Sequence, residues 1–319
     1  MQKEDKYNKN SFSGVVLNRL NRFGYGLSAF VLLFTISDKS LGEIIWNGNE
    51  TKLIKENELM PGVETWVVVP GLGVQSGSGI ASTLNSNLGH RQNLTYFNYS
   101  DDGTDIEIMA SDIVELYNET QAPINIYAHS MGASISLEVL KNLNNTVPVK
   151  SIIFDCSPYD VNDAQNPAAP LYSEFSIAYP GGFFTKIGAE VLNNTVWHEN
   201  NNLSLYGQLK DSFRIAITGS SPRLFTNQLG LLGDTKSDDY KYYISEDTRL
   251  MYLKPQVSTE DDTVMVDNAI AKYKTIIGDK LIVVNIPNAK HASPTQRPNE
   301  YNNALWPYIV GLQEEPHLK

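Results

Sequence analysis

The sequence predicts an α/β protein with a mostly parallel central sheet and helices on both of its faces. From residue 65 onward, short and almost wholly apolar runs alternate with stretches that carry apolar residues at helical spacing. Such continuous apolar runs are typical of parallel strands, because both faces of these strands are buried. Strands are predicted over residues 65–69, 94–99, 124–128, 149–155, 250–257 and 280–286, and helices over 132–143, 264–276 and 299–312. A further helix is predicted to follow a capping box at residues 104–107.

Composition and charge limit the classes of function. The chain has 319 residues, of which 41% are hydrophobic and 19% charged, as in a globular protein with a large core. Its net charge of −11 argues against nucleic acid as a partner, because phosphate repels an acidic surface. Cys156 is the single cysteine, so the chain can form no internal disulfide and its stability must come from packing.

The alternation of strands and helices breaks between residues 157 and 247. This stretch is rich in proline and aromatic residues and contains the pair Gly181-Gly182. A structureless loop of about ninety residues is improbable in a compact protein. We therefore expect residues 158–247 to form an inserted cap or lid subdomain, within a core made of residues 51–157 and 248–319.

One serine lies in a pattern that favours nucleophilic chemistry. The predicted strand 124–128 leads directly into Ala128-His129-Ser130-Met131-Gly132, and a helix follows. A sharp turn of this kind lifts a serine hydroxyl off the end of a sheet, and small residues two positions before and after the serine avoid clashes with the backbone. The N-terminus of the following helix favours negative charge there. The simpler interpretation is a serine that only caps the helix.

This strand–turn–helix motif resembles the α/β-hydrolase family, and the resemblance extends over residues 60–312. Residues 70–73 (Pro-Gly-Leu-Gly) occupy the place where the family has His-Gly after its third strand. The resemblance implies that the backbone N–H groups of Leu72 and Met131 form an oxyanion hole. Pro70 is a departure from the family pattern, because it removes a side chain that often braces this loop.

The same resemblance implies a general base and an acid. Of the five histidines, His291 comes just after the last predicted strand, where the family has its histidine loop. Residues 260–264 look like the family's Asp-x-x-Val turn, in which Asp262 is the preferred acid and Asp261 its near alternative. A second alternative is Asp155 at the end of the preceding strand, the position that some lipases use. The order Ser130, Asp262, His291 is that of the fold.

The resemblance implies a serine hydrolase that cleaves a small-molecule carboxylic ester through an acyl-enzyme on Ser130. Peptidase, thioesterase and acyltransferase activities stay open on the same fold, as does a catalytically silent relative that only binds a ligand. Residues 71–77 nearly form a dinucleotide fingerprint, but the glycine spacing is wrong for a nucleotide-dependent oxidoreductase. We expect no cofactor, and no metal, since His-Glu-x-x-His and Cys-x-x-Cys motifs are absent from the sequence.

The N-terminal segment, residues 1–50, leaves two alternatives for the location of the protein. Lys and Arg side chains precede the uncharged stretch 23–37, which is the order seen in signal sequences and N-terminal anchors. Fifteen helical residues reach only about 22 Å, against roughly 30 Å for a bilayer core. One expectation is membrane association or export with the catalytic domain outside. The alternative is a cytoplasmic protein in which residues 29–36 form a buried strand.

Overall fold

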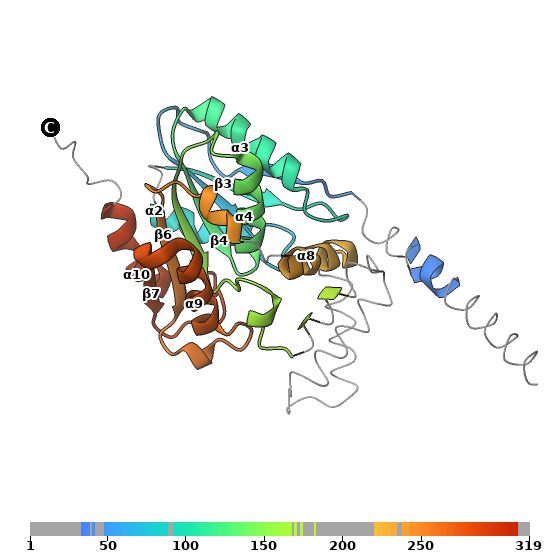
Figure 1. Ribbon diagram of the computed structural model, residues 1–319. Coiled ribbons are helices and arrows are strands. Elements are labelled where there is room, and N and C mark those ends of the chain that lie inside the picture. The colour runs from blue at the N-terminus through green and yellow to red at the C-terminus, as the bar shows by residue number, and fades with distance from the viewer. Residues whose placement is uncertain are drawn as a thin grey trace, which may run out of the picture.

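A seven-stranded sheet forms the centre of the computed structural model, with strand order β1-β3-β2-β4-β5-β6-β7 (Figure 1). Strand β1 is antiparallel to β3, and every other neighbouring pair is parallel. The strands are β1 Lys52–Lys55, β2 Thr65–Val69, β3 Asn93–Asn98, β4 Ile124–His129, β5 Val149–Asp155, β6 Arg249–Pro255 and β7 Leu281–Ile286. The structure describes residues 33–38, 40–41, 48–88, 92–167, 169–170, 173–174, 182, 220–234 and 238–311.

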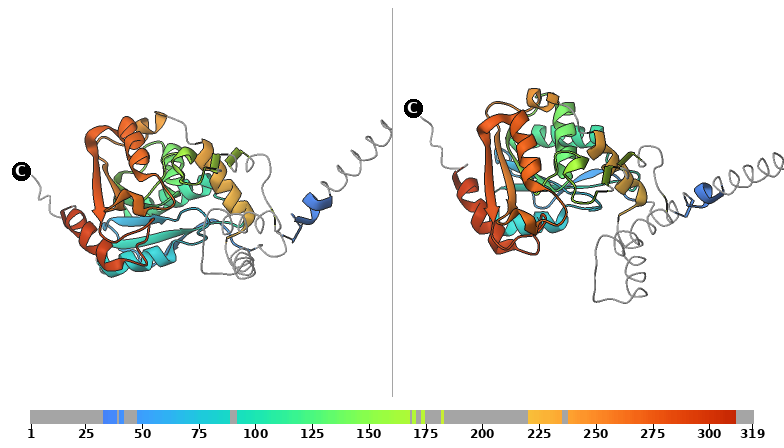
Figure 2. Two further views of the ribbon diagram at one scale, coloured as in Figure 1. Left: turned by 90° about the horizontal axis from the view of Figure 1, so that it is seen from below. Right: turned by 60° about the horizontal axis from the view of Figure 1, so that its bottom comes forward.

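Helices cover both faces of the sheet, as Figure 2 shows. Side chains alternate along β2, so that Trp66 and Val68 join one apolar cluster while Val67 and Val69 join the other. The first cluster includes residues of α2 and α10, and the second includes residues of α3, α4, α8 and α9. The helices are α2 Ser78–Leu88, α3 Ile106–Thr120, α4 Gly132–Leu143, α8 Pro222–Asp234, α9 Val266–Ile277 and α10 Pro298–Gly311.

The predicted fold class is confirmed, and the six predicted strands lie within two residues of their predicted ends. Strand β1 was not predicted, because its outer residues Lys52 and Lys55 are exposed and charged, and only the two residues between them are partly buried. The capping box is corrected in one detail. Asp105, not Thr104, caps α3 by accepting a hydrogen bond from the Ile108 N–H.

The N-terminal stretch and the insertion are described only in part. Residues 33–38 are helical, so the alternative of a buried strand is wrong for 33–36, and the rest of 23–37 lies outside the described residues. No helix among the residues that the structure describes is long and apolar enough to cross a membrane. Most of the predicted lid also lies outside the described residues. Its described part includes α8, whose apolar side chains belong to the same core cluster as those of α4.

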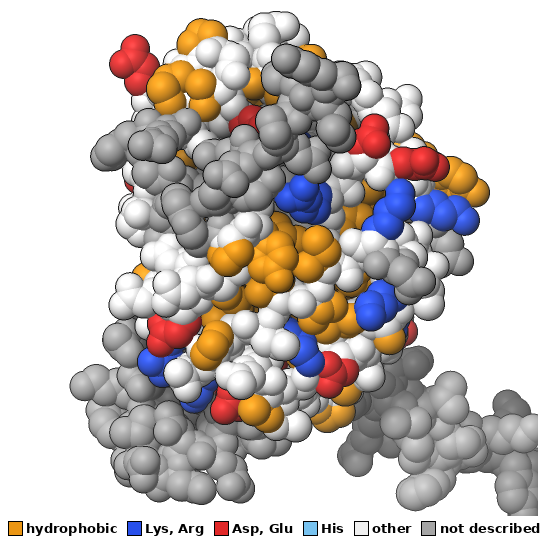
Figure 3. Space-filling view, turned by 90° about the vertical axis from the view of Figure 1, so that its left-hand side faces the viewer, with side chains coloured by type: hydrophobic (Ala, Val, Ile, Leu, Met, Phe, Trp, Pro, Cys, Tyr) orange, Lys and Arg blue, Asp and Glu red, His pale blue; other side chains and the backbone are white. Residues whose placement is uncertain are grey.

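Strand β7 forms one edge of the sheet, and α10 packs beside it. Figure 3 shows this side of the molecule, where apolar side chains gather near the centre and Lys, Arg, Asp and Glu side chains surround them. Ile282 and Val283 of β7 are partly buried. Charged side chains around a sheet edge oppose its pairing with the edge of another chain.

Candidate active site

Ser130 lies on a sharp turn between β4 and α4. Its φ angle of 52° is in the left-handed region, which non-glycine residues rarely adopt. The Ser130 N–H donates to the Asp155 carbonyl oxygen at 2.8 Å, which ties the turn to the end of β5. A Cβ atom on Gly132 would lie 2.2 Å from the Val69 carbonyl oxygen, so only glycine fits there. The predicted strand–turn–helix geometry is therefore present at this serine.

The structure brings Ser130 and His291 into contact. The Ser130 Oγ atom lies 2.8 Å from His291 Nε2, although the two residues are 161 positions apart in the sequence. His291 follows β7 in a tight loop in which Asn288 and Ala292 also have positive φ angles, of 55° and 31°. The Ser130 side chain is buried, and 18% of the His291 side chain is exposed. Both predicted residues thus meet at the carboxyl edge of the sheet.

Asp261, not Asp262, is the carboxylate that faces His291. Both Asp261 carboxylate oxygens lie 3.1 Å from His291 Nδ1, and the Asp261 side chain is fully buried. Its Oδ1 atom also accepts hydrogen bonds from the N–H groups of Thr263 and Val264, at 3.0 and 2.8 Å. Asp262 is exposed and accepts a bond from the Thr263 hydroxyl. The prediction that Asp262 partners the histidine is wrong, because the turn that follows Asp261 directs the Asp261 carboxylate inward and leaves Asp262 on the surface.

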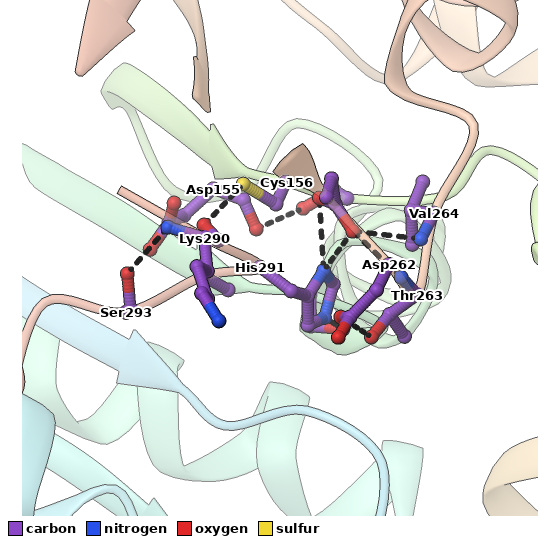
Figure 4. A network of polar contacts seen from close by, with 12 residues as sticks. Asp155, Cys156, Asp262, Thr263, Val264, Lys290, His291 and Ser293 are labelled. Atoms are coloured by element: carbon purple, nitrogen blue, oxygen red, sulfur yellow. Dashed lines mark hydrogen bonds and ion pairs between the residues drawn. The ribbon is translucent and has the colours of Figure 1, made fainter. Parts of the chain in front are cut away.

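Asp155 lies close to this group, as Figure 4 shows, but its carboxylate is bonded to two tyrosines. It is fully buried, and its carboxylate accepts bonds from the hydroxyls of Tyr127 and Tyr301, at 2.6 and 2.9 Å. Burial raises the pKa of Asp155 to about 6. Among the described contacts, Asp155 has no hydrogen bond to His291, so Asp261 fits the position of the histidine's partner better.

Cys156, Asp261 and His291 bring three potential metal-ligand atoms within 4.8 Å of one another. Two of these groups already satisfy each other, since Asp261 accepts the His291 Nδ1–H. Burial, with Asp155 and Asp261 nearby, raises the pKa of the Cys156 thiol. Zinc binds the thiolate form of cysteine, which this environment disfavours. The arrangement therefore suits proton transfer along the imidazole better than metal ligation.

His129 has a supporting position beside the site. Its Nε2 atom lies 2.8 Å from the Ala292 carbonyl oxygen in the histidine loop. Burial lowers the pKa of His129 to about 4, so the ring is neutral at pH 7 and donates its Nε2–H to that carbonyl. His129 therefore contacts the loop that carries His291 rather than the Ser130 hydroxyl. The other three histidines lie outside the described residues.

The loop predicted to supply an oxyanion donor packs directly against Ser130. A Cβ atom on Gly71 would lie 2.9 Å from the Ser130 Cβ atom. Leu72 follows Gly71 in the chain and Met131 follows Ser130, so each candidate donor is adjacent to one side of this contact. The Tyr99 hydroxyl donates to the Pro70 carbonyl oxygen at 2.7 Å. Gln228, from α8, contacts the same loop.

Gln228 is a supporting residue that the sequence patterns did not reveal. It is fully buried, and its Oε1 atom accepts the Gly73 N–H at 2.9 Å while its Nε2 atom donates to the Gly71 carbonyl oxygen at 3.4 Å. With Tyr99, it braces the loop that lacks the family's histidine at Pro70. It was missed because it lies in the insertion, 157 residues from Gly71, and no local motif marks it.

The sequence matches no known family model and no curated protein, but solved structures share its fold. A structure from a study of carboxylesterases of the archaeon Nitrososphaera gargenis is 13% identical and has a TM-score of 0.59, over 85% of this chain and 98% of that one. MenH from S. aureus is 12% identical, with a TM-score of 0.56 over 83% and 100%. A thermophilic esterase from Thermogutta terrifontis is 14% identical, with a TM-score of 0.54 over 82% and 93%.

These similarities cover more than four fifths of the chain. At such low sequence identity they show the fold, and they do not identify a substrate. The chain therefore belongs to the α/β-hydrolase fold.

Proposed function

We propose that the protein is a serine hydrolase that cleaves small-molecule carboxylic esters through an acyl-enzyme on Ser130. One observation carries this proposal: a continuous line of contacts from Asp261 to His291, at 3.1 Å, and from His291 to Ser130, at 2.8 Å. This is the arrangement of acid, base and nucleophile that activates a serine hydroxyl.

In this proposal, each residue of the line has a separate role, which the contacts support. Asp261 accepts the Nδ1–H of His291, which leaves Nε2 unprotonated and able to take the Ser130 proton. The Ser130 oxygen then attacks the ester carbonyl carbon, and the protonated His291 returns its proton to the departing alcohol. Water, deprotonated by His291, attacks the acyl-enzyme and releases the carboxylic acid with the serine restored.

The proposed oxyanion donors are the backbone N–H groups of Leu72 and Met131. Met131 directly precedes the first residue of α4, so the N-terminal end of this helix also favours negative charge at the reacting oxygen. Among the described residues, neither N–H donates a hydrogen bond to another protein atom. Both groups are therefore available to a bound oxyanion.

An ester is the substrate class that the site chemistry and the similar structures support together. The study of the Nitrososphaera structure concerns carboxylesterases, and the Thermogutta protein is an esterase. Peptidases, thioesterases and acyltransferases would use the same three residues. They differ in the leaving group, or in whether water or another acceptor takes the acyl group.

A substrate panel tests the proposal. We expect turnover of p-nitrophenyl esters of graded chain length, slower turnover of the matched p-nitroanilides, and free acid rather than a transferred acyl group when an alcohol is added. Faster cleavage of anilides or of acyl thioesters, or transfer to the alcohol, would replace the ester proposal with the corresponding activity. Absence of both turnover and fluorophosphonate labelling would indicate a ligand-binding protein.

Replacing Gln228 by leucine is expected to slow ester hydrolysis more than it weakens substrate binding. The change leaves the Gly73 N–H and the Gly71 carbonyl without their partner, which costs about 1–3 kcal/mol for a buried group. A displaced oxyanion loop should lower kcat by roughly tenfold, because stabilisation of the oxyanion depends on donor position. Steady-state kinetics and thermal unfolding measure the two effects.

Asn227, the neighbour of Gln228 on α8, provides a matched control. Its Oδ1 atom accepts bonds from the Thr104 N–H and hydroxyl, so it ties α8 to the start of α3 and not to the oxyanion loop. Asn227→Leu should reduce thermal stability while kcat stays near that of the wild type. Equal kcat losses in the two variants would mean that Gln228 acts only by holding α8 in place.

A further inference from the structure

A buried carboxylate lies beside the site without taking part in the proposed reaction. Asp155, at the carboxyl end of β5, has none of its surface exposed. The Tyr127 hydroxyl of β4 donates to one carboxylate oxygen at 2.6 Å, and the Tyr301 hydroxyl of α10 donates to the other at 2.9 Å. A buried charge is stable only when such bonds compensate for its lost hydration. Two buried tyrosine hydroxyls therefore hold this carboxylate in place.

In the described contacts, Tyr301 reaches the histidine loop and Tyr127 does not. The Tyr301 hydroxyl, while it donates to Asp155, also accepts a hydrogen bond from the Ser293 N–H at 3.0 Å. The Ser293 hydroxyl in turn accepts the Lys290 N–H at 3.2 Å, as Figure 4 shows. These bonds enclose His291, since Lys290 precedes it and Ser293 follows it by two residues. No motif in the sequence links α10 to this loop, and the contact arises from the fold.

The backbone of the histidine loop is strained, so its conformation depends on contacts with the surrounding structure. Asn288 and Ala292 both have left-handed backbone angles, which asparagine tolerates but which cost of order 1–2 kcal/mol for a residue such as Ala292. A loop that stores strain relaxes unless the surrounding structure holds it. Relaxation here would move the His291 ring, whose Nε2 atom must stay 2.8 Å from the Ser130 oxygen.

We propose that Tyr301 is a positioning residue for catalysis, which connects the buried Asp155 carboxylate to the Ser293 N–H and so holds His291 in line with Ser130. This inference rests on the proposed serine-hydrolase function. Tyr301 touches none of the reacting atoms, and it acts through the backbone of the loop. Asp155 accordingly serves as the fixed point of this connection, while Asp261 is the carboxylate that contacts the imidazole.

Two tyrosine variants in the full-length protein separate positioning from simple stabilisation. Tyr127→Phe and Tyr301→Phe each remove one hydroxyl from the same carboxylate, and both side chains are fully buried. We expect both variants to unfold at lower temperature. Only Tyr301→Phe should also lower kcat, by roughly tenfold or more, with KM within about twofold of the wild type, because a misplaced catalytic group slows the chemical step.

A second measurement gives a result that does not depend on turnover. In protein with labelled histidine, the His291 ring signals should shift or broaden in Tyr301→Phe and remain near those of the wild type in Tyr127→Phe. Equal kcat values in the two variants, with unchanged His291 signals, would overturn the proposal. If wild-type protein neither cleaves esters nor reacts with a fluorophosphonate at Ser130, the proposed function fails, while the ring signals still decide whether Tyr301 positions the loop.

Discussion

Ser130→Ala is expected to remove essentially all ester hydrolysis. Loss of the serine from a comparable catalytic group costs about a millionfold in kcat, because the histidine and acid act only through it. The fold should be unaffected. Alanine keeps the Cβ atom and therefore the same strained turn, and the backbone bond from residue 130 to the Asp155 carbonyl does not involve the hydroxyl. Steady-state assays and thermal unfolding of the purified variant test both statements.

The control for this variant is Ser134→Ala. Ser134 lies four residues after Ser130, within α4, and is also buried, but among the described contacts its hydroxyl has no hydrogen bond to His291. It should retain kcat and fluorophosphonate labelling. Hydrolysis by Ser130→Ala above about one hundredth of the wild-type rate would show that another group is the nucleophile.

Asp261→Asn is expected to lower kcat by about ten-thousandfold, as the equivalent change does in a serine protease. The Thr263 and Val264 N–H groups require an acceptor at Oδ1, so the amide oxygen of asparagine must occupy that place. Its NH₂ group then faces His291 Nδ1 as a donor. The imidazole responds by carrying its proton on Nε2, where it cannot accept the Ser130 proton.

Asp262→Asn gives the matched comparison, since the two residues are adjacent and only the first is buried. Asp262 contacts the Thr263 hydroxyl on the surface, so we expect its kcat to stay within about threefold of the wild type. Stopped assays at saturating ester measure both variants. A loss of kcat of about ten-thousandfold in Asp262→Asn would assign the acid to Asp262 instead. The same loss in Asp155→Asn, with Asp261→Asn still active, would assign it to Asp155.

The turn at Ser130 could be predicted because its determinants are local. A buried strand, two small residues around the serine and an apolar helix all lie within residues 124–143. All three features favour the same sharp turn, so the pattern predicts the backbone conformation at Ser130 as well as the identity of the nucleophile. The position of His291 was predicted from the resemblance to the family, in which the histidine loop follows the last strand.

The acid was missed by one residue, for a reason that is visible in the sequence. Asp261 and Asp262 are neighbours, and hydropathy does not distinguish which of two adjacent carboxylates turns inward. Val264 does give a signal: it stands three residues after Asp261, and its N–H binds the Asp261 carboxylate. The Asp-x-x-Val spacing therefore fits Asp261 literally.

Gln228 and Tyr301 could not be predicted, because their roles depend on packing between distant segments. Gln228 is an ordinary polar residue on α8 until the helix lies against the loop at Gly71. Tyr301 looks like a core aromatic residue on α10, and only the fold brings its hydroxyl between Asp155 and Ser293. A single sequence contains no pattern that joins such positions.

The long separation between the parts of the site has a consequence for the order of folding. Ser130 lies between β4 and α4, whereas His291 lies 161 residues further along the chain than Ser130, and Gln228 contacts Gly71, 157 residues before it. Contacts that close long loops form late, because the chain loses conformational entropy on closing the loop before the new contacts stabilise it. In a partly folded chain, Ser130 therefore has no histidine beside it and is an unactivated alcohol. Acylation becomes possible only after the segment that carries His291 has packed against the sheet.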